Sequence, residues 1–154
     1  MKEKMKKIDK IVVPIDFTKS TRKQANYALY IAGNLHADID FFHVVADYPA
    51  DAMIGSPNAQ QYQEKNFADS KKRMAKLIMD SREICPGCDG EVAFGDPVDQ
   101  IVEFADSKKA DLIIVSTHDA KGLEKILLGS LAEHVMNKAH CPVLVMKPFN
   151  NTSH

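Results

Sequence analysis

The chain has 154 residues, a length that favours one domain with a single hydrophobic core. Its 20 lysines and arginines nearly balance its 21 aspartates and glutamates, so no overall field draws it toward nucleic acid or an anionic membrane. No apolar stretch of signal-peptide or membrane-span length follows the basic start MKEKMKK, and three cysteines, an odd number, do not suggest a disulfide scaffold, so we expect a cytoplasmic protein.

The first half of the chain alternates apolar runs with amphipathic segments. An apolar run at residues 10–13 predicts a strand, and Ser20 and Thr21 are suitable N-caps for a helix whose alanines follow at helical spacing. A second strand is expected at residues 39–45, IDFFHVV. The stretch that follows contains two prolines, one glycine and no periodicity, so we interpret residues 48–63 as an exposed excursion or lid.

The second half continues the alternation. A charged helix is expected to end near the CPGC motif at residues 85–88, because proline and glycine stop helices, and a third strand follows at residues 91–94. Asp96 and Pro97 are typical of the N-cap and the first position of a helix. The apolar run at residues 110–115 is typical of a strand buried on both faces of a parallel sheet.

A last helix and the apolar strand Val143–Met146 complete a pattern of strands alternating with helices. The pattern predicts an α/β fold, a doubly wound, Rossmann-like sandwich with a five-stranded parallel sheet, for which we take the strand order 3-2-1-4-5. Such sheets bind ligands beyond the carboxyl ends of the strands, where the strand order reverses. The first strand ends at Asp16 and the fourth at Ser116, so we expect these segments to face each other across this crevice.

Four stretches of the chain carry a family pattern. They are KIVVPIDFTKST, FFHVVAD, FGDPVDQIVEFADSKKADLIIVSTHD and GLEKILLGSLAEHVMNKAHCPVLVMKP. Together they resemble the universal stress protein family, small cytoplasmic domains of the stress response. The resemblance implies a universal stress protein domain at residues 10–148, between an N-terminal extension at residues 1–9 and a C-terminal tail at residues 149–154.

The same resemblance implies an adenine-nucleotide site. In nucleotide-binding members, a G-x2-G-x9-G-[S/T] loop follows the fourth strand. The residues at the family's binding positions in this chain are Pro14, Asp16, Val44, Ser116, Asp119, Gly129 and Ser130. By resemblance, Asp16 would hold the ribose hydroxyls, while Pro14 and the backbone of Val44 would border the adenine. Gly129 and Ser130 would bind phosphate.

Two positions of the loop depart from the pattern, because Ser116 and Asp119 stand where the family has glycines. Glycine there lets backbone N–H groups approach a polyphosphate closely. Ser116 is a mild change, but a carboxylate at Asp119 within ~5 Å of phosphate oxygens would repel them by roughly 1 kcal/mol or more. Mg²⁺ would reverse that sign, since carboxylates and phosphates form a common Mg²⁺ ligand set. We expect weak binding of ATP or a related adenine nucleotide.

Ordinary structural roles are also available to these residues. Ser130 at the start of a helix could be a plain N-cap, and Asp16 could be only a turn and cap residue. His43 is expected to be a packed or backbone-bonded strand residue, and the pair His118-Asp119 is too small a set to predict a metal site. No metal site is predicted within the protein.

Cys85 and Cys88 form a C-x-x-C motif that invites a redox interpretation. In thioredoxin-type sites the motif lies where a strand enters a helix, whose N-terminus stabilises the thiolate. Here it follows a helix and precedes a strand, which disfavours a catalytic role. A redox-sensitive surface clip stays open.

Two functional hypotheses follow. The first is a module that binds an adenine nucleotide and signals its occupancy to a partner. The second is a dimeric interaction protein of the stress response that binds no nucleotide. The apolar strand Val143–Met146 should lie at a sheet edge and predicts a homodimer, as the resemblance also implies. Slow ATP hydrolysis is a third hypothesis, but no residue is an evident general base, so we do not predict an enzyme.

Overall fold

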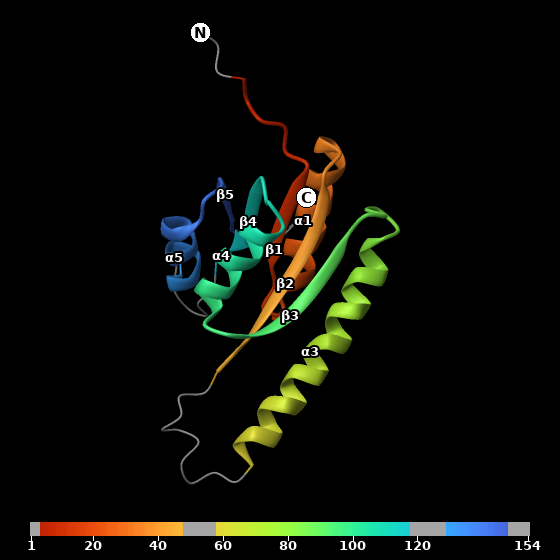
Figure 1. Cartoon of the computed structure of the whole chain (residues 1–154). Helices are drawn as coiled ribbons and strands as arrows, with labels where there is room; N and C mark the ends of the chain where they lie inside the picture. Colours follow the sequence, from red (N-terminus) through yellow and green to blue (C-terminus); the bar gives the residue numbers. More distant parts are fainter. Residues whose placement is uncertain (1–3, 48–57, 118–128, 148–154) are drawn as a thin grey trace, which may run out of the picture.

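The computed structural model describes residues 4–47, 58–117 and 129–147, and these form one parallel sheet with helices on both faces (Figure 1). The helices and strands, in chain order, are β1 (Lys10–Pro14), α1 (Thr21–Leu35), β2 (Asp38–Ala46), α3 (Ala59–Ser81), β3 (Asp89–Gly95), α4 (Pro97–Ser107), β4 (Leu112–Ser116), α5 (Ser130–Lys138) and β5 (Val143–Met146).

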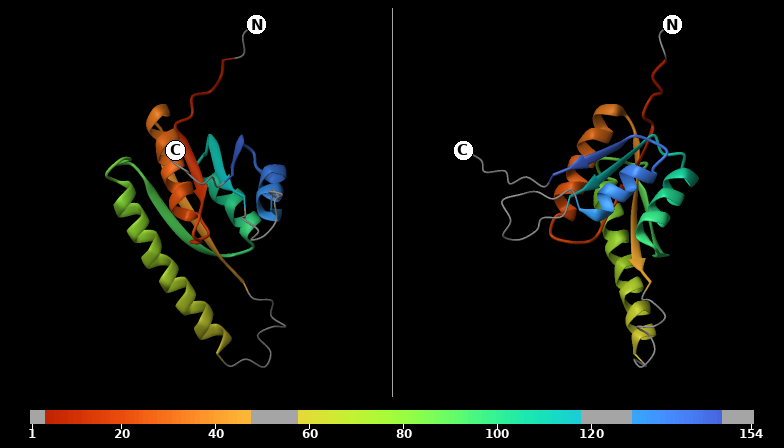
Figure 2. Two further views of the ribbon diagram at one scale, coloured as in Figure 1. Left: turned by 180° about the vertical axis from the view of Figure 1, so that it is seen from behind. Right: turned by 90° about the vertical axis from the view of Figure 1, so that its left-hand side faces the viewer.

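The sheet has the order β3-β2-β1-β4-β5, and all its strand pairs are parallel. Helices α1 and α3 cover one face, whereas α4 and α5 cover the other (Figure 2). The predicted doubly wound α/β sandwich and its strand order 3-2-1-4-5 are therefore confirmed. The switch in strand order lies between β1 and β4.

Each face of the sheet has its own hydrophobic core. In β1, Ile11 and Val13 pack toward α1 and α3, while Val12 packs toward α4 and α5, and all three are fully buried. This explains why the strand is continuously apolar instead of alternating. On the second face, Phe42 of β2 stacks on Phe104 of α4, with ring centroids 4.0 Å apart.

Two predicted segment ends are wrong. Residues 59–63, taken as part of an excursion, form the first turns of α3, because the sequence AQQYQ consists of good helix formers even without an apolar stripe. The rest of that excursion, residues 48–57, lies outside the described residues. Helix α3 also ends at Ser81, before the CPGC motif, and the N–H groups of Ile84 and Cys85 both turn back to the Ser81 carbonyl.

Helix starts depend on different residues. In α4 the side chain of Asp96 accepts a hydrogen bond from the N–H of Asp99 at 3.0 Å, and Pro97 is the first helical residue, as predicted. In α1, Ser20 occupies the N-cap position, but its backbone is helical and its side chain makes no capping bond. The expectation of a Ser20 side-chain cap is therefore wrong.

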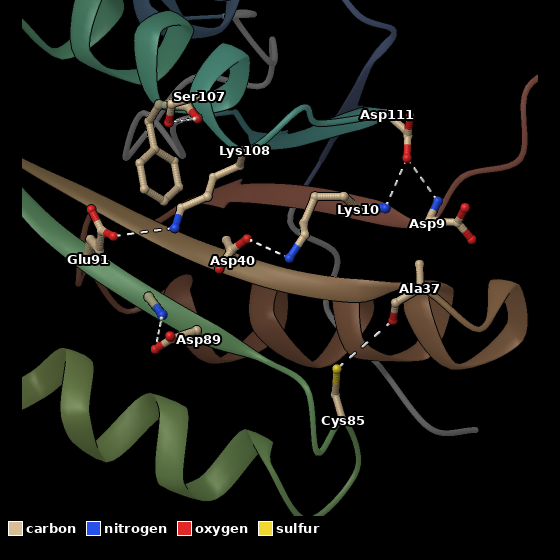
Figure 3. A network of polar contacts seen from close by, with 12 residues as sticks. Asp9, Lys10, Ala37, Asp40, Cys85, Asp89, Glu91, Ser107, Lys108 and Asp111 are labelled. Atoms are coloured by element: carbon tan, nitrogen blue, oxygen red, sulfur yellow. Dashed lines mark hydrogen bonds and ion pairs between the residues drawn. The ribbon is translucent and has the colours of Figure 1, made fainter.

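The amino edge of the sheet is held by charged groups (Figure 3). The carboxylate of Asp111 accepts hydrogen bonds from the N–H groups of Asp9 at 3.0 Å and Lys10 at 3.1 Å. Lys6 lies 2.6 Å from the same carboxylate and is the main cause of its lowered pKa. The Lys10 ammonium pairs with buried Asp40 at 2.9 Å. These bonds join the starts of β1, β2 and β4 at the edge opposite the predicted crevice.

No helix in the described part of the chain is long and apolar enough to cross a membrane.

Candidate functional site

A cavity of about 170 Å³ lies at the carboxyl ends of the central strands. Four of the residues predicted from sequence line it, and they come from three strands and the segment after β1: Pro14, Asp16, Val44 and Ser116. Its remaining wall is mostly apolar and includes Ile101 of α4 and Leu131 of α5. The structure thus brings together residues from opposite sides of the switch point.

The cavity exists because β1 and β4 separate early. They pair only at Ile11 with Leu112 and at Val12 with Ile113, whereas β1 stays paired with β2 as far as Pro14. Pro14 has no N–H group with which to extend the ladder. The two strands therefore diverge where a ligand would enter.

Gln24 of α1 bridges the diverging strands, and sequence reasoning missed it. Its side chain is buried, and Nε2 donates to the carbonyls of Pro14 at 2.8 Å and Ile114 at 3.2 Å. The amide supplies donors that the broken strand ladder lacks. Its signal in the sequence was a glutamine directly beside the apolar stripe of the helix.

Asp16 lies exposed at the edge of the cavity and organises the chain between β1 and α1. Its Oδ1 accepts hydrogen bonds from the Thr18 N–H at 3.0 Å and the Thr18 hydroxyl at 2.8 Å, and from the Thr21 hydroxyl at 3.4 Å. These are the bonds of a turn residue, the alternative role considered for Asp16, and its ribose-binding role stays a prediction. These bonds fix the carboxylate at the end of β1, where it faces the cavity.

His43 supports the same segment from β2. Its Nδ1 lies 2.6 Å from the Ile15 carbonyl, and because a carbonyl can only accept, this nitrogen carries the proton. Burial lowers the pKa of His43, against the raising effects of that hydrogen bond and of Asp16. Its ring also contacts Phe17, with centroids 4.7 Å apart. The prediction of a packed, backbone-bonded histidine is confirmed.

Gly129 and Ser130 form the start of α5, next to cavity residue Leu131. Gly129 is the N-cap, with φ 70° and ψ 142°, a conformation that favours glycine. Ser130 is the first helical residue, so the alternative that Ser130 is the N-cap is wrong. Gly129 has no side chain with which to cap the helix, and the first N–H groups of α5 follow it, next to cavity residue Leu131. Asp119 lies outside the described residues.

The sequence model of the Universal stress protein family matches residues 7–147. The chain belongs to this family. Universal stress protein MJ0531 of Methanocaldococcus jannaschii is 36% identical over 138 residues, which cover 90% of this chain and 81% of that protein. The resemblance inferred from the four sequence stretches is confirmed.

Solved universal stress proteins share the fold. UspA from Lactobacillus plantarum superposes with a TM-score of 0.78 at 22% identity, covering 92% of this chain and 99% of the other. A family protein from Arabidopsis thaliana, solved with AMP bound, has a TM-score of 0.66 at 19% identity and covers 95% of both chains. This chain is thus a stress-response protein of a family whose members are generally non-enzymatic and commonly dimeric.

In this universal stress protein domain, Cys85 and Cys88 are free, buried thiols just before β3. Figure 3 shows Cys85 at the amino edge of the sheet, away from the crevice. The Cys85 Sγ contacts the Ala37 carbonyl at 4.0 Å, and the Cys88 Sγ contacts the Ile78 carbonyl at 3.7 Å. Burial raises the pKa of Cys88 to about 11, so its reactive thiolate is scarce at neutral pH. The described residues contain no group of three or more His, Cys, Asp or Glu side chains that could hold a metal ion.

Proposed function

We propose that this domain binds an adenine nucleotide in the crevice between β1 and β4 and acts in the stress response as a nucleotide-responsive module. One observation carries the proposal: the diverging strand ends enclose a cavity with an apolar wall, a carboxylate at its edge and, beside it, a helix start whose N-cap is Gly129. The Arabidopsis family protein solved with AMP supports the ligand class.

The described residues suit a base and a ribose. Pro14, Val44 and Leu131 give the cavity flat or apolar surfaces against which an adenine ring would pack. The volume of about 170 Å³ is below the roughly 300–1,000 Å³ of complete ligand pockets, so the cavity matches the base instead of a whole nucleotide. The exposed carboxylate of Asp16 is an acceptor for ribose hydroxyls at the cavity edge.

The phosphates would lie toward the start of α5. Its first N–H groups and the positive end of the helix dipole favour anions, and Gly129 places no side chain in their way. Ser116 adds a hydroxyl at the end of β4. Asp119 opposes phosphate unless Mg²⁺ neutralises it, so each added phosphate should increase the requirement for Mg²⁺.

A second candidate function is association without a nucleotide, and β5 favours it. This strand, Val143–Met146, is an edge strand of the sheet, and three of its four apolar residues are only partly buried. An apolar edge with unpaired backbone groups is suited to pairing with a second copy. We propose a homodimer through this strand; sedimentation should give twice the chain mass at micromolar concentration, and a monomer would refute it.

The nucleotide proposal is tested by calorimetry on protein stripped of carried-over nucleotide, with AMP and ATP, each with and without Mg²⁺. The variant Asp119→Gly separates the two roles of that carboxylate. Stronger ATP binding by the variant without Mg²⁺ would show that Asp119 repels phosphate, whereas loss of Mg²⁺-dependent binding would show that it holds the ion. Wild type and variant that both fail to bind any of these nucleotides would refute the proposal.

Asp16→Asn is the matched test of the ribose contact, and it should weaken AMP binding about tenfold because a charge-assisted hydrogen bond is lost. Asp38→Asn is its control. Asp38 is exposed at the start of β2, at the opposite edge of the sheet, and its substitution removes the same charge. Equal weakening by both variants would assign the effect to net charge and not to the site.

A further inference from the structure

A separate groove of about 570 Å³ lies between α1 and α3, on the other face of the sheet from the nucleotide crevice. It shares no lining residue with that crevice. Its apolar surface comes from Ala25 and Leu29 of α1, Leu77 of α3, and Ile84 just beyond α3. Its volume lies within the roughly 300–1,000 Å³ range of ligand pockets.

Ile84 is unusual for a residue that follows a helix. Its side chain is 65% exposed although it is large and apolar, and it lines this groove. A scattered surface apolar residue needs no explanation, but Ile84 lines the same groove as the partly buried Leu77, and together they give the groove a surface suited to an apolar ligand.

The opposite end of the groove is basic. Lys19 lies just before α1 and Arg22 in its first turn, while Arg73 and Lys76 belong to α3. Lys76 is paired with Asp80 at 3.2 Å, but within the described part of the chain neither Arg22 nor Arg73 has an ion-pair partner. Two acidic residues, Asp80 and Glu83, also line the groove. Its four basic residues outnumber them, so the groove combines an apolar surface with an excess of positive charge.

Helix stability does not account for Arg22. It lies in the first turn of α1, which contains no acidic residue. The positive end of the helix dipole disfavours cations there, at a cost of about 0.3–1 kcal/mol. Arg22 therefore lies at an electrostatically unfavourable position, and it lines the same groove as Arg73, a cation from another helix.

We propose that this groove binds an amphipathic anion of medium chain length, with its acyl chain on the apolar surface and its head group between Arg22 and Arg73. The seven-residue step from Arg22 to Leu29 spans roughly 10 Å at the helical rise of about 1.5 Å per residue. That span suits an acyl chain of medium length, for which a ten-carbon chain is the probe. Arginine binds carboxylate and phosphate heads equally well by geometry, so both chemistries fit.

The test is calorimetry on the full chain with decanoate and decyl phosphate, below the concentrations at which they form micelles. We expect saturable binding of at least one anion at one site per chain. Preference for decanoate would identify a fatty acid as the ligand class, and preference for decyl phosphate a phosphorylated lipid. Decanol, with the same chain but no charge, should bind at least fivefold more weakly, and decyltrimethylammonium should not bind at this site.

Matched variants locate the binding. The double variant Arg22→Gln/Arg73→Gln should lose at least fivefold in affinity, whereas Lys65→Gln, an exposed change of charge elsewhere on α3, should not. Ile84→Ser should weaken binding about threefold, while Met79→Ser, with a side chain of the same exposure (66%) that does not line the groove, should leave it unchanged.

Several results would overturn the proposal. They are no binding of either anion, decanol binding as tightly as the anions, or equal losses in the control variants. Lys65→Gln, Met79→Ser and Ile84→Ser lie outside the cavities that Asp16 and Val44 line, so AMP binding by these variants shows that they are folded and separates this proposal from that of the nucleotide site. Arg73 lines a second cavity with Asp16 and Val44, so the folding of the double variant is checked by circular dichroism.

Discussion

Gln24 gives the sharpest prediction about how the crevice is built. Replacing it with leucine keeps a side chain of similar size but removes the donor to the carbonyls of Pro14 and Ile114. Two hydrogen bonds of about 1 kcal/mol each are lost, and the two acceptor carbonyls belong to buried residues. Since leucine recovers part of this through apolar burial, we expect a net loss of about 1–2 kcal/mol in the free energy of unfolding.

Urea unfolding followed by circular dichroism measures this loss. The control is Gln61→Leu, an exposed glutamine in the first turn of α3, which should change stability by less than about 0.5 kcal/mol. Gln24→Glu sharpens the test. A carboxylate facing two carbonyls should have a raised pKa, so this variant should gain stability relative to wild type as the pH falls toward 4. Gln24→Leu with wild-type stability would refute the bridging role.

Three further predictions concern single residues. Folding lowers the pKa of His43, so the imidazole takes up a proton at a higher pH in the unfolded chain than in the folded one. The contribution of His43 to the free energy of unfolding should therefore decline as the pH falls below about 6.5. Between pH 7.5 and 5, the free energy of unfolding should fall more steeply for the wild type than for His43→Asn, and equal slopes would contradict this. Gly129→Ala should destabilise the domain by about 1 kcal/mol in thermal unfolding, since alanine is strained at φ 70°; an unchanged melting temperature would contradict the observed helix start. Cys88, buried and with a pKa of about 11, should react with a thiol reagent at pH 8 only after unfolding. Rapid labelling of Cys88 itself in the native protein, distinguished by peptide mass spectrometry from labelling of the partly buried Cys141, would contradict its placement.

The topology was predictable because each strand is a short apolar run with a recognisable helix start or turn after it. Asp96-Pro97 specifies the start of α4 through local chemistry alone, and the structure confirms it. Residues 59–63 carry no comparable signal, and their helical structure was not predicted. They are helical without an apolar stripe, so periodicity, which reports burial, gave no signal for them.

At the candidate site, the sequence predicted residues better than it predicted their roles. Pro14, Asp16, Val44 and Ser116 do share one cavity. The bridge from Gln24 was not predictable, because it depends on where β1 and β4 stop pairing, a property of three elements together. Similarly, Ser130 is a good N-cap by type, but the positive φ at the preceding position makes Gly129 the cap. The contribution of Asp119 and the β5 homodimer stay predictions.

The most direct test of the central claim is an AMP titration followed through backbone amide shifts by NMR spectroscopy. The account predicts saturable shifts at Asp16, Val44, Gly129 and Ser130, the residues around the crevice, with little change along Asp89–Gly95 of the far edge strand. No saturable shifts, or shifts confined to the opposite face between α1 and α3, would contradict a nucleotide site between β1 and β4.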